Sequence, residues 1–285
     1  MELPPHRTGT VASGDVELFY RMFGKPGKSP VLIFHGANYY DSADWVHVAA
    51  ALAGDRQVAA WDTRGFGRSG WSRSKDYSDD QQMADIDVLV DHFDWDRFIP
   101  MGHSMGGGRS ILYASRFPDR VAALIVVDHR PGKGGGVAAT LERNIGRKPV
   151  VYPSIEAAQE KMSRDINTPA GSPARERLME ILRKVDGGYT YPRDPDFQNQ
   201  VPIGGEGGKA KIVVDDTWRE LSRVTVPILI VRATRSDRYT LPAIQRVKTE
   251  FPHIKMVDVE SGHDVAGGAP EQLIAAARAF LAVNG

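Results

Sequence analysis

The pentapeptide Gly102-His103-Ser104-Met105-Gly106 is the stretch on which the interpretation of this chain depends. It follows the apolar run at residues 98–101 and precedes a segment with helical spacing, so it predicts a strand–turn–helix junction. A turn this tight needs glycine two residues before and two residues after the serine, because a side chain at either position would clash. Such a turn lifts the serine hydroxyl into a cleft, and the sequence therefore predicts Ser104 as a nucleophile.

The composition limits the classes of protein to consider. The chain has 285 residues, of which 41% are hydrophobic, enough for one large α/β domain or one domain with an insertion. Its 36 basic residues balance 36 acidic ones, so we expect neither a nucleic acid nor a membrane as partner. The absence of cysteine excludes disulfides, thiolate catalysis and thiolate-bound zinc. No apolar run resembles a signal segment or a membrane span, and we expect a cytoplasmic monomer or homodimer.

Strands and helices alternate along most of the chain. Apolar runs predict strands at residues 16–20, 31–34, 57–61, 98–101 and 121–127, the first two forming a hairpin, and helices at 78–93 and 105–117. A capping box of Ser78 and Gln81 opens the first helix. Strands at 227–233 and 254–259 and helices at 241–251 and 270–283 follow after a break. This alternation is typical of a parallel sheet with helices on both faces.

The break in this rhythm predicts an inserted cap. Flexible glycine-rich joints lie at 131–136 and 204–208, and helical spacing between them is clearest from Ser172 to Gly187. The interruption is too long for a plain connection. We therefore expect a core formed by residues 1–130 and 223–285, and a mostly helical cap at residues 131–222.

Two residues near the end of the chain complete the expected site. His263 follows the last predicted strand, and Asp237 follows the strand before it. Ligands bind outside the carboxyl ends of the strands in open parallel sheets, and Ser104 lies at such an end too. A base and an orienting acid are what a serine nucleophile needs, so we predict catalytic roles for Ser104, Asp237 and His263.

The chain resembles the α/β-hydrolase superfamily over nearly its whole length except the cap. The matching segments are His35-Gly36, the run at 61–69, the pentapeptide at 102–106, the strand that ends in Asp128, and the loops with Asp237 and Gly262-His263. The resemblance implies an α/β-hydrolase fold, with a mostly parallel eight-stranded sheet and the cap inserted after the sixth strand. It also implies that backbone N–H groups of Ala37 and Met105 form an oxyanion hole.

The triad acid has two candidates. Some members of the superfamily place the acid after the sixth strand, where Asp128 lies in this chain. We favour Asp237, because it has the usual position after the seventh strand and a predicted helix entry at Leu241 follows it. Asp128 is then a strand-end carboxylate that bonds the neighbouring backbone.

Contacts with substrate, metal or cofactor are less marked in the sequence. Asn38 could add a donor beside the oxyanion, Arg130 could clamp a carboxylate, and Trp218 could line an apolar pocket. The glycine-rich run at 65–70 spells a dinucleotide motif, but no helix begins there. The strand-end histidines lack helical metal-ligand spacing. We expect no cofactor and no metal.

These patterns favour a serine hydrolase of a small carboxylic ester or lactone. In length and cap size the chain is most similar to the enol-lactone hydrolases and C–C bond hydrolases of aromatic-ring degradation. Within that group we favour an enol-lactone as substrate. The alternatives that share the same triad are a C–C bond hydrolase, a haloperoxidase or perhydrolase, and a ligand sensor that has lost turnover.

Overall fold

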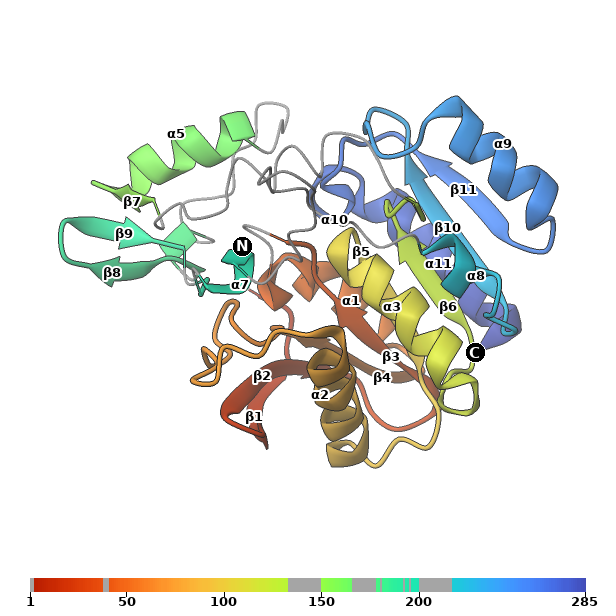
Figure 1. Cartoon of the computed structure of the whole chain (residues 1–285), viewed down its shortest axis with the longest axis horizontal. Helices are drawn as coiled ribbons and strands as arrows, with labels where there is room; N and C mark the ends of the chain where they lie inside the picture. The colour runs from red at the N-terminus through yellow and green to blue at the C-terminus, as the bar shows by residue number, and fades with distance from the viewer. Residues whose placement is uncertain are drawn as a thin grey trace, which may run out of the picture.

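An eight-stranded sheet forms the centre of the molecule (Figure 1). The computed structural model describes residues 3–37, 41–132, 150–165, 178–179, 181–191, 193–194, 196–199 and 217–285. In sheet order the strands are β1 (Arg7–Ser13), β2 (Val16–Phe23), β4 (Arg56–Trp61), β3 (Lys28–Phe34), β5 (Ile99–His103), β6 (Leu124–Val127), β10 (Ile228–Ala233) and β11 (Lys255–Val259). β2 is antiparallel to both its neighbours, and the strands from β4 to β11 are parallel. The mostly parallel eight-stranded sheet is confirmed.

Helices cover both faces of this sheet, as predicted. One face packs against α2 (Asp79–His92), α3 (Met105–Arg116), α8 (Trp218–Leu221) and α9 (Leu241–Glu250), and the other against α1 (Val46–Leu52), α10 (Val265–Gly268) and α11 (Pro270–Asn284). Strand β3 shows why: Leu32 and Phe34 join one apolar cluster, and Val31 and Ile33 join the other. In the part of the chain described, no helix has both the length and the apolar character needed to cross a membrane.

Two local predictions in the core differ from the structure. The predicted hairpin between residues 16–20 and 31–34 is wrong: β2 pairs with β1 across a turn at Gly14, whose φ is +58°, and with β4 on its other side. Helix α1 and strand β1 were not predicted. At the start of α2, Ser78 Oγ accepts from the Gln81 N–H, while the Gln81 side chain donates to Asp85 instead of completing a capping box.

The described part of the inserted segment contains a second sheet. Its strands are β7 (Val151–Tyr152), β9 (Gly188–Thr190) and β8 (Arg183–Val185), in that order, beside α5 (Ile155–Asp165) and α7 (Asp196–Asn199) (Figure 1). The helix predicted to reach Gly187 is therefore wrong at residues 183–185, because Asp186-Gly187 forms a hairpin turn there. Most of both glycine-rich joints lies outside the described residues.

The end of the predicted cap packs with the core. In α8, Trp218 and Leu221 are buried in the same apolar cluster as α2 and α3. Residues 218–221 therefore pack with the core although they precede residue 223. The division into core and cap at 131–222 stays a prediction.

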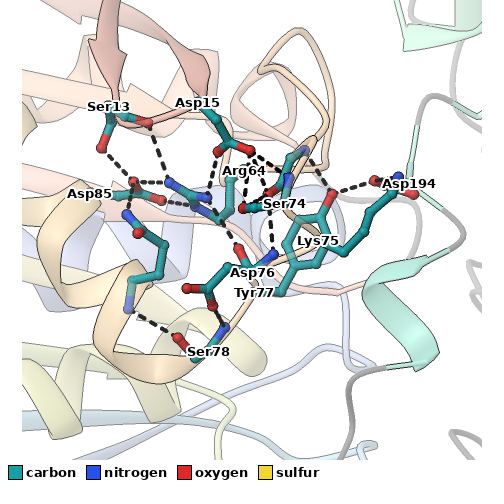
Figure 2. Close-up of polar contacts among 12 residues, drawn as sticks. Ser13, Asp15, Arg64, Ser74, Lys75, Asp76, Tyr77, Ser78, Asp85 and Asp194 are labelled. Carbon is teal, nitrogen blue, oxygen red and sulfur yellow. Dashed lines mark hydrogen bonds and ion pairs between the residues drawn. The ribbon is translucent and has the colours of Figure 1, made fainter.

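A polar network fastens the inserted segment to the core (Figure 2). The buried Arg64 guanidinium donates to both oxygens of Asp85, each at 2.6 Å, and to the Asp76 carbonyl at 3.1 Å. This fixes the loop after β4, from which Tyr77 donates to the Asp194 carboxylate and Lys75 lies 3.4 Å from the same group. The inserted segment is thus held by charge-assisted bonds at a point beside the carboxyl edge of the sheet.

Candidate active site

Ser104 lies on a strained turn between β5 and α3. Its φ is +52° and its ψ −115°, a conformation that residues other than glycine rarely adopt. A Cβ added at Gly102 would lie 2.2 Å from the Gly106 carbonyl oxygen, and one added at Gly106 would lie 2.5 Å from the Phe34 carbonyl oxygen. Both glycines are therefore required for the turn, as the sequence predicts. The Ser104 N–H donates to the Val127 carbonyl at 3.0 Å, which ties the turn to β6.

His263 bridges Ser104 and a buried carboxylate. Its Nε2 lies 2.9 Å from Ser104 Oγ, and its Nδ1 lies 2.7 Å from Asp128 Oδ2. The Asp128 side chain is 0% exposed, and its other oxygen accepts the Ala233 N–H at 3.1 Å. With the carboxylate ionised, Nδ1 carries the imidazole proton and Nε2 is left to accept the serine proton. The three side chains form the relay of a serine nucleophile.

The predicted placement of Asp237 beside His263 is wrong. The Asp237 side chain is 68% exposed and pairs with Arg238 at 3.0 Å, whereas Asp128 occupies the position against the imidazole. Both aspartates follow neighbouring parallel strands, β6 and β10, so both reach the same edge of the sheet. Asp128 takes a positive φ of 44°, and its carboxylate contacts the imidazole with one oxygen and Ala233, the last residue of β10, with the other. Asp237 lies farther out, on the exposed part of that loop.

The predicted oxyanion-hole residues belong to two neighbouring parts of the fold. Met105 is the first residue of α3, and the first N–H groups of a helix have no partner within the helix. Ala37 follows the His35-Gly36 turn after β3, the strand beside β5 in the sheet. Donation from these two N–H groups stays a prediction. Asn38 lies outside the described residues.

Three further histidines lie around the site; His35 and His103 are buried, and His129 is partly buried. His35 accepts from the Thr63 N–H at 3.0 Å, and His103 Nε2 lies 2.7 Å from the His263 carbonyl oxygen. Burial lowers the pKa of His35 and of His129 to about 4 and that of His103 well below its usual range, so all three are neutral at pH 7. Within the described ranges, no three His, Asp or Glu side chains are grouped so that they could hold a metal ion.

A cavity of about 800 Å³ lies along α3 and reaches Met105, the residue after Ser104, although neither Ser104 nor His263 is among its described lining residues. Its described lining includes Met105, Arg109, His129, Trp218 and Phe251. Trp218, a predicted substrate contact, thus borders the cavity, although only 9% of the residue is exposed and its ring stacks on Phe251. Arg130, the other described candidate, is half-buried and is not among these lining residues.

Sequence reasoning missed Arg109 altogether. It lies five residues after Ser104 in a helix that the sequence predicts well, at a position where an arginine ordinarily indicates a solvated face. The helical spacing from Met105 to Arg109 was the available signal, because residues four apart share one face of a helix.

The fold is matched by known proteins. A family model described as an alpha/beta hydrolase fold matches residues 29–139. Lipase 1 of Psychrobacter immobilis is 31% identical over 257 residues, which cover 89% of this chain and 77% of the lipase. The 3-oxoadipate enol-lactonase 2 of Acinetobacter baylyi is 24% identical and covers 90% of each chain. The crystal structure of E-2-(acetamidomethylene)succinate hydrolase superposes with a TM-score of 0.82 at 23% identity, over 98% of this chain and 100% of the other.

Proposed function

Because the chain belongs to the α/β-hydrolase family, we propose that it is a cofactor-free serine hydrolase that cleaves a small carboxylic ester or lactone. The observation that supports this most is the hydrogen-bonded relay from Ser104 through His263 to Asp128. The names of two relatives, a lipase and an enol-lactonase, support an ester bond as the target. Within this class we propose a lactone, including an enol-lactone, as the substrate.

Acylation begins with attack by Ser104 Oγ on the carbonyl carbon of the ester. As the new C–O bond forms, the serine proton passes to His263 Nε2, and Asp128 stabilises the resulting imidazolium. The carbonyl oxygen becomes an oxyanion facing the N–H groups of Ala37 and Met105, each worth about 3 kcal/mol to the transition state. Collapse of the tetrahedral intermediate breaks the ester C–O bond, and the leaving oxygen takes the proton from His263.

Deacylation repeats the same steps with water. His263 Nε2 takes a proton from water, whose oxygen attacks the acyl carbon, and the proton then returns to Ser104 Oγ as the carboxylic acid leaves. With a lactone, the leaving oxygen stays attached to the acyl chain, so one ring-opened hydroxy acid is the product. An enol-lactone releases an enol that becomes the keto acid.

The decisive experiment compares Ser104→Ala with the unaltered protein on a panel of 4-nitrophenyl esters and five- and six-membered lactones. We expect kcat to fall about a million-fold, the loss measured for a triad serine in another hydrolase. A fluorophosphonate probe should label the unaltered protein and leave the variant unlabelled. Ser115→Ala is the matched control on the same helix, because its hydroxyl only bonds the Leu112 carbonyl, and it should keep both activities.

Two results would contradict the proposal. Retention of more than about one per cent of the activity in folded Ser104→Ala would remove the serine from the mechanism. A folded protein that neither reacts with the probe nor turns over any ester would instead favour a ligand sensor on the same fold.

A further inference from the structure

Arg109 carries a buried charge that forms no salt bridge within the described part of the chain. The residue is 8% exposed, and its Nη1 is fully buried without a hydrogen-bond partner. Arg64, also buried, shows the usual arrangement, since Asp85 holds it at two atoms. An unpaired buried cation destabilises a protein by several kcal/mol unless something else compensates it. Burial also lowers the pKa of Arg109, to about 10, and it stays charged at neutral pH.

Arg109 lines the same cavity as Met105, the residue that follows the nucleophile in the chain. Met105 and Arg109 are one helical turn apart on α3 and line the same cavity of about 800 Å³, together with His129. From the inserted segment, Phe197 packs on Arg109, with 5.7 Å between the guanidinium carbon and the ring centroid. Arg109 is thus anchored on α3, and Phe197 of the inserted segment packs on its guanidinium.

Two of the other three arginines of this cavity are already neutralised, and the third, Arg219, is exposed to solvent. Arg116 lies 2.7 Å from the Asp80 carboxylate, and Arg246 lies 2.8 Å from Glu250. Asp79 also lines the cavity and attracts Arg109 electrostatically, but the two side chains form no salt bridge. The Arg109 guanidinium is therefore left to bind the anionic group of a ligand.

We propose that Arg109 binds a carboxylate of the substrate, so that the enzyme prefers esters or lactones that carry an acidic group on the acyl side. This inference rests on the proposed function, because it assigns the substrate class of the same site. A guanidinium suits a carboxylate because its N–H groups can donate two parallel bonds to the two oxygens. The covalent step at Ser104 is unchanged, and Arg109 only fixes where the acyl chain lies.

The test uses two esters that differ in one charge: the mono-4-nitrophenyl ester of adipic acid, and 4-nitrophenyl methyl adipate, in which the free carboxylate is methylated. We expect the unaltered protein to show the higher kcat/KM on the acid. Arg109→Met keeps the apolar volume and should lower kcat/KM for the acid about ten- to a hundred-fold, with the methyl ester nearly unchanged. Arg109→Lys, which keeps the charge without the fork, should lose less.

Arg116→Gln is the matched control, since it removes an arginine of the same helix whose charge Asp80 already neutralises. The ratio of the two kcat/KM values should not change in this variant. A parallel Arg130→Ala variant tests the arginine that the sequence suggested: if it abolishes the preference while Arg109→Met keeps it, the proposal is overturned. Equal losses on both esters in Arg109→Met, or no preference in the unaltered protein, would overturn it as well.

A binding experiment separates this proposal from the proposed function. In Ser104→Ala, adipate should raise the Tm more than its dimethyl ester does, and the Arg109→Met or Arg109→Lys change should abolish or reduce that difference. If no ester is hydrolysed but this difference is found, the reaction class is wrong and the carboxylate site stands. If adipate does not stabilise the protein at all, the site is refuted whatever the catalytic result.

Discussion

Replacing Asp128 by asparagine changes the hydrogen-bonding capacity of one atom in the relay and almost nothing else. The Ala233 N–H points at Oδ1, so the carboxamide oxygen must face Ala233 and its NH₂ must face His263. An NH₂ group can only donate, which forces Nδ1 to give up its proton and places that proton on Nε2. The imidazole then cannot accept the serine proton. Asparagine also tolerates the positive φ of 44° at this position, so the variant should fold.

The expected loss is large. The same change in a serine protease with this relay lowers kcat about 10,000-fold, which corresponds to about 5.5 kcal/mol of transition-state stabilisation. The matched variant is Asp237→Asn, which removes an exposed charge paired with Arg238, and its kcat should change about threefold or less.

Initial rates of 4-nitrophenyl butyrate hydrolysis measure both effects. They are divided by the concentration of active sites, which is counted from covalent labelling with a fluorophosphonate. Circular dichroism and the urea midpoint show whether each variant is folded. The role of Asp128 as the acid is refuted if Asp237→Asn loses the larger factor, or if Asp128→Asn keeps more than about a tenth of the activity.

Two further predictions concern stability. Arg64→Met should lower the unfolding free energy by about 3–5 kcal/mol, because the buried Asp85 carboxylate loses its cationic partner. Urea unfolding measures this loss, and a value below about 1 kcal/mol would contradict the prediction. Acid should also destabilise the fold: between pH 6.5 and about 4 the unfolded chain protonates His35 and His129 while the folded protein keeps them neutral. Each should cost about 3 kcal/mol of unfolding free energy as the pH falls, partly offset by Asp62, whose pKa burial raises to about 6. The urea midpoint should fall between pH 7 and 4.5, and it should depend less steeply on pH in His129→Gln. If either result is not found, these groups are not coupled to folding.

Much of the core could be predicted because its strands carry continuous apolar runs. The residues of β3, β6 and β10 point alternately into two buried clusters, so both faces of each strand are apolar and the sequence shows it directly. Pairing partners carry no such signal. The chain from β2 to β3 is short enough for a hairpin, yet the structure inserts β4 between them. Only the whole sheet determines that order.

The site could be predicted to the level of the sheet edge and no further. Ser104 and His263 were identified because the tight glycine turn and the strand-end loops are local features. The choice between Asp128 and Asp237 depends on which side chain turns inward, and a backbone torsion decides that. Arg109 was missed because sequence shows the charge but not its burial. In the inserted segment, the Asp186-Gly187 turn outweighed the helical spacing around it.

The position of the acid has a consequence for how this enzyme can be changed. Asp128 follows β6 and accepts a hydrogen bond from the Ala233 N–H at the end of β10, so two neighbouring strands hold it in place. The exposed segment around Asp237, just beyond β10, therefore does not supply the carboxylate that contacts His263. We expect that this segment can be lengthened, mutated or fused to a recognition peptide without displacing the catalytic residues. It is the natural place for evolution, or for a protein engineer, to add a new specificity to this hydrolase.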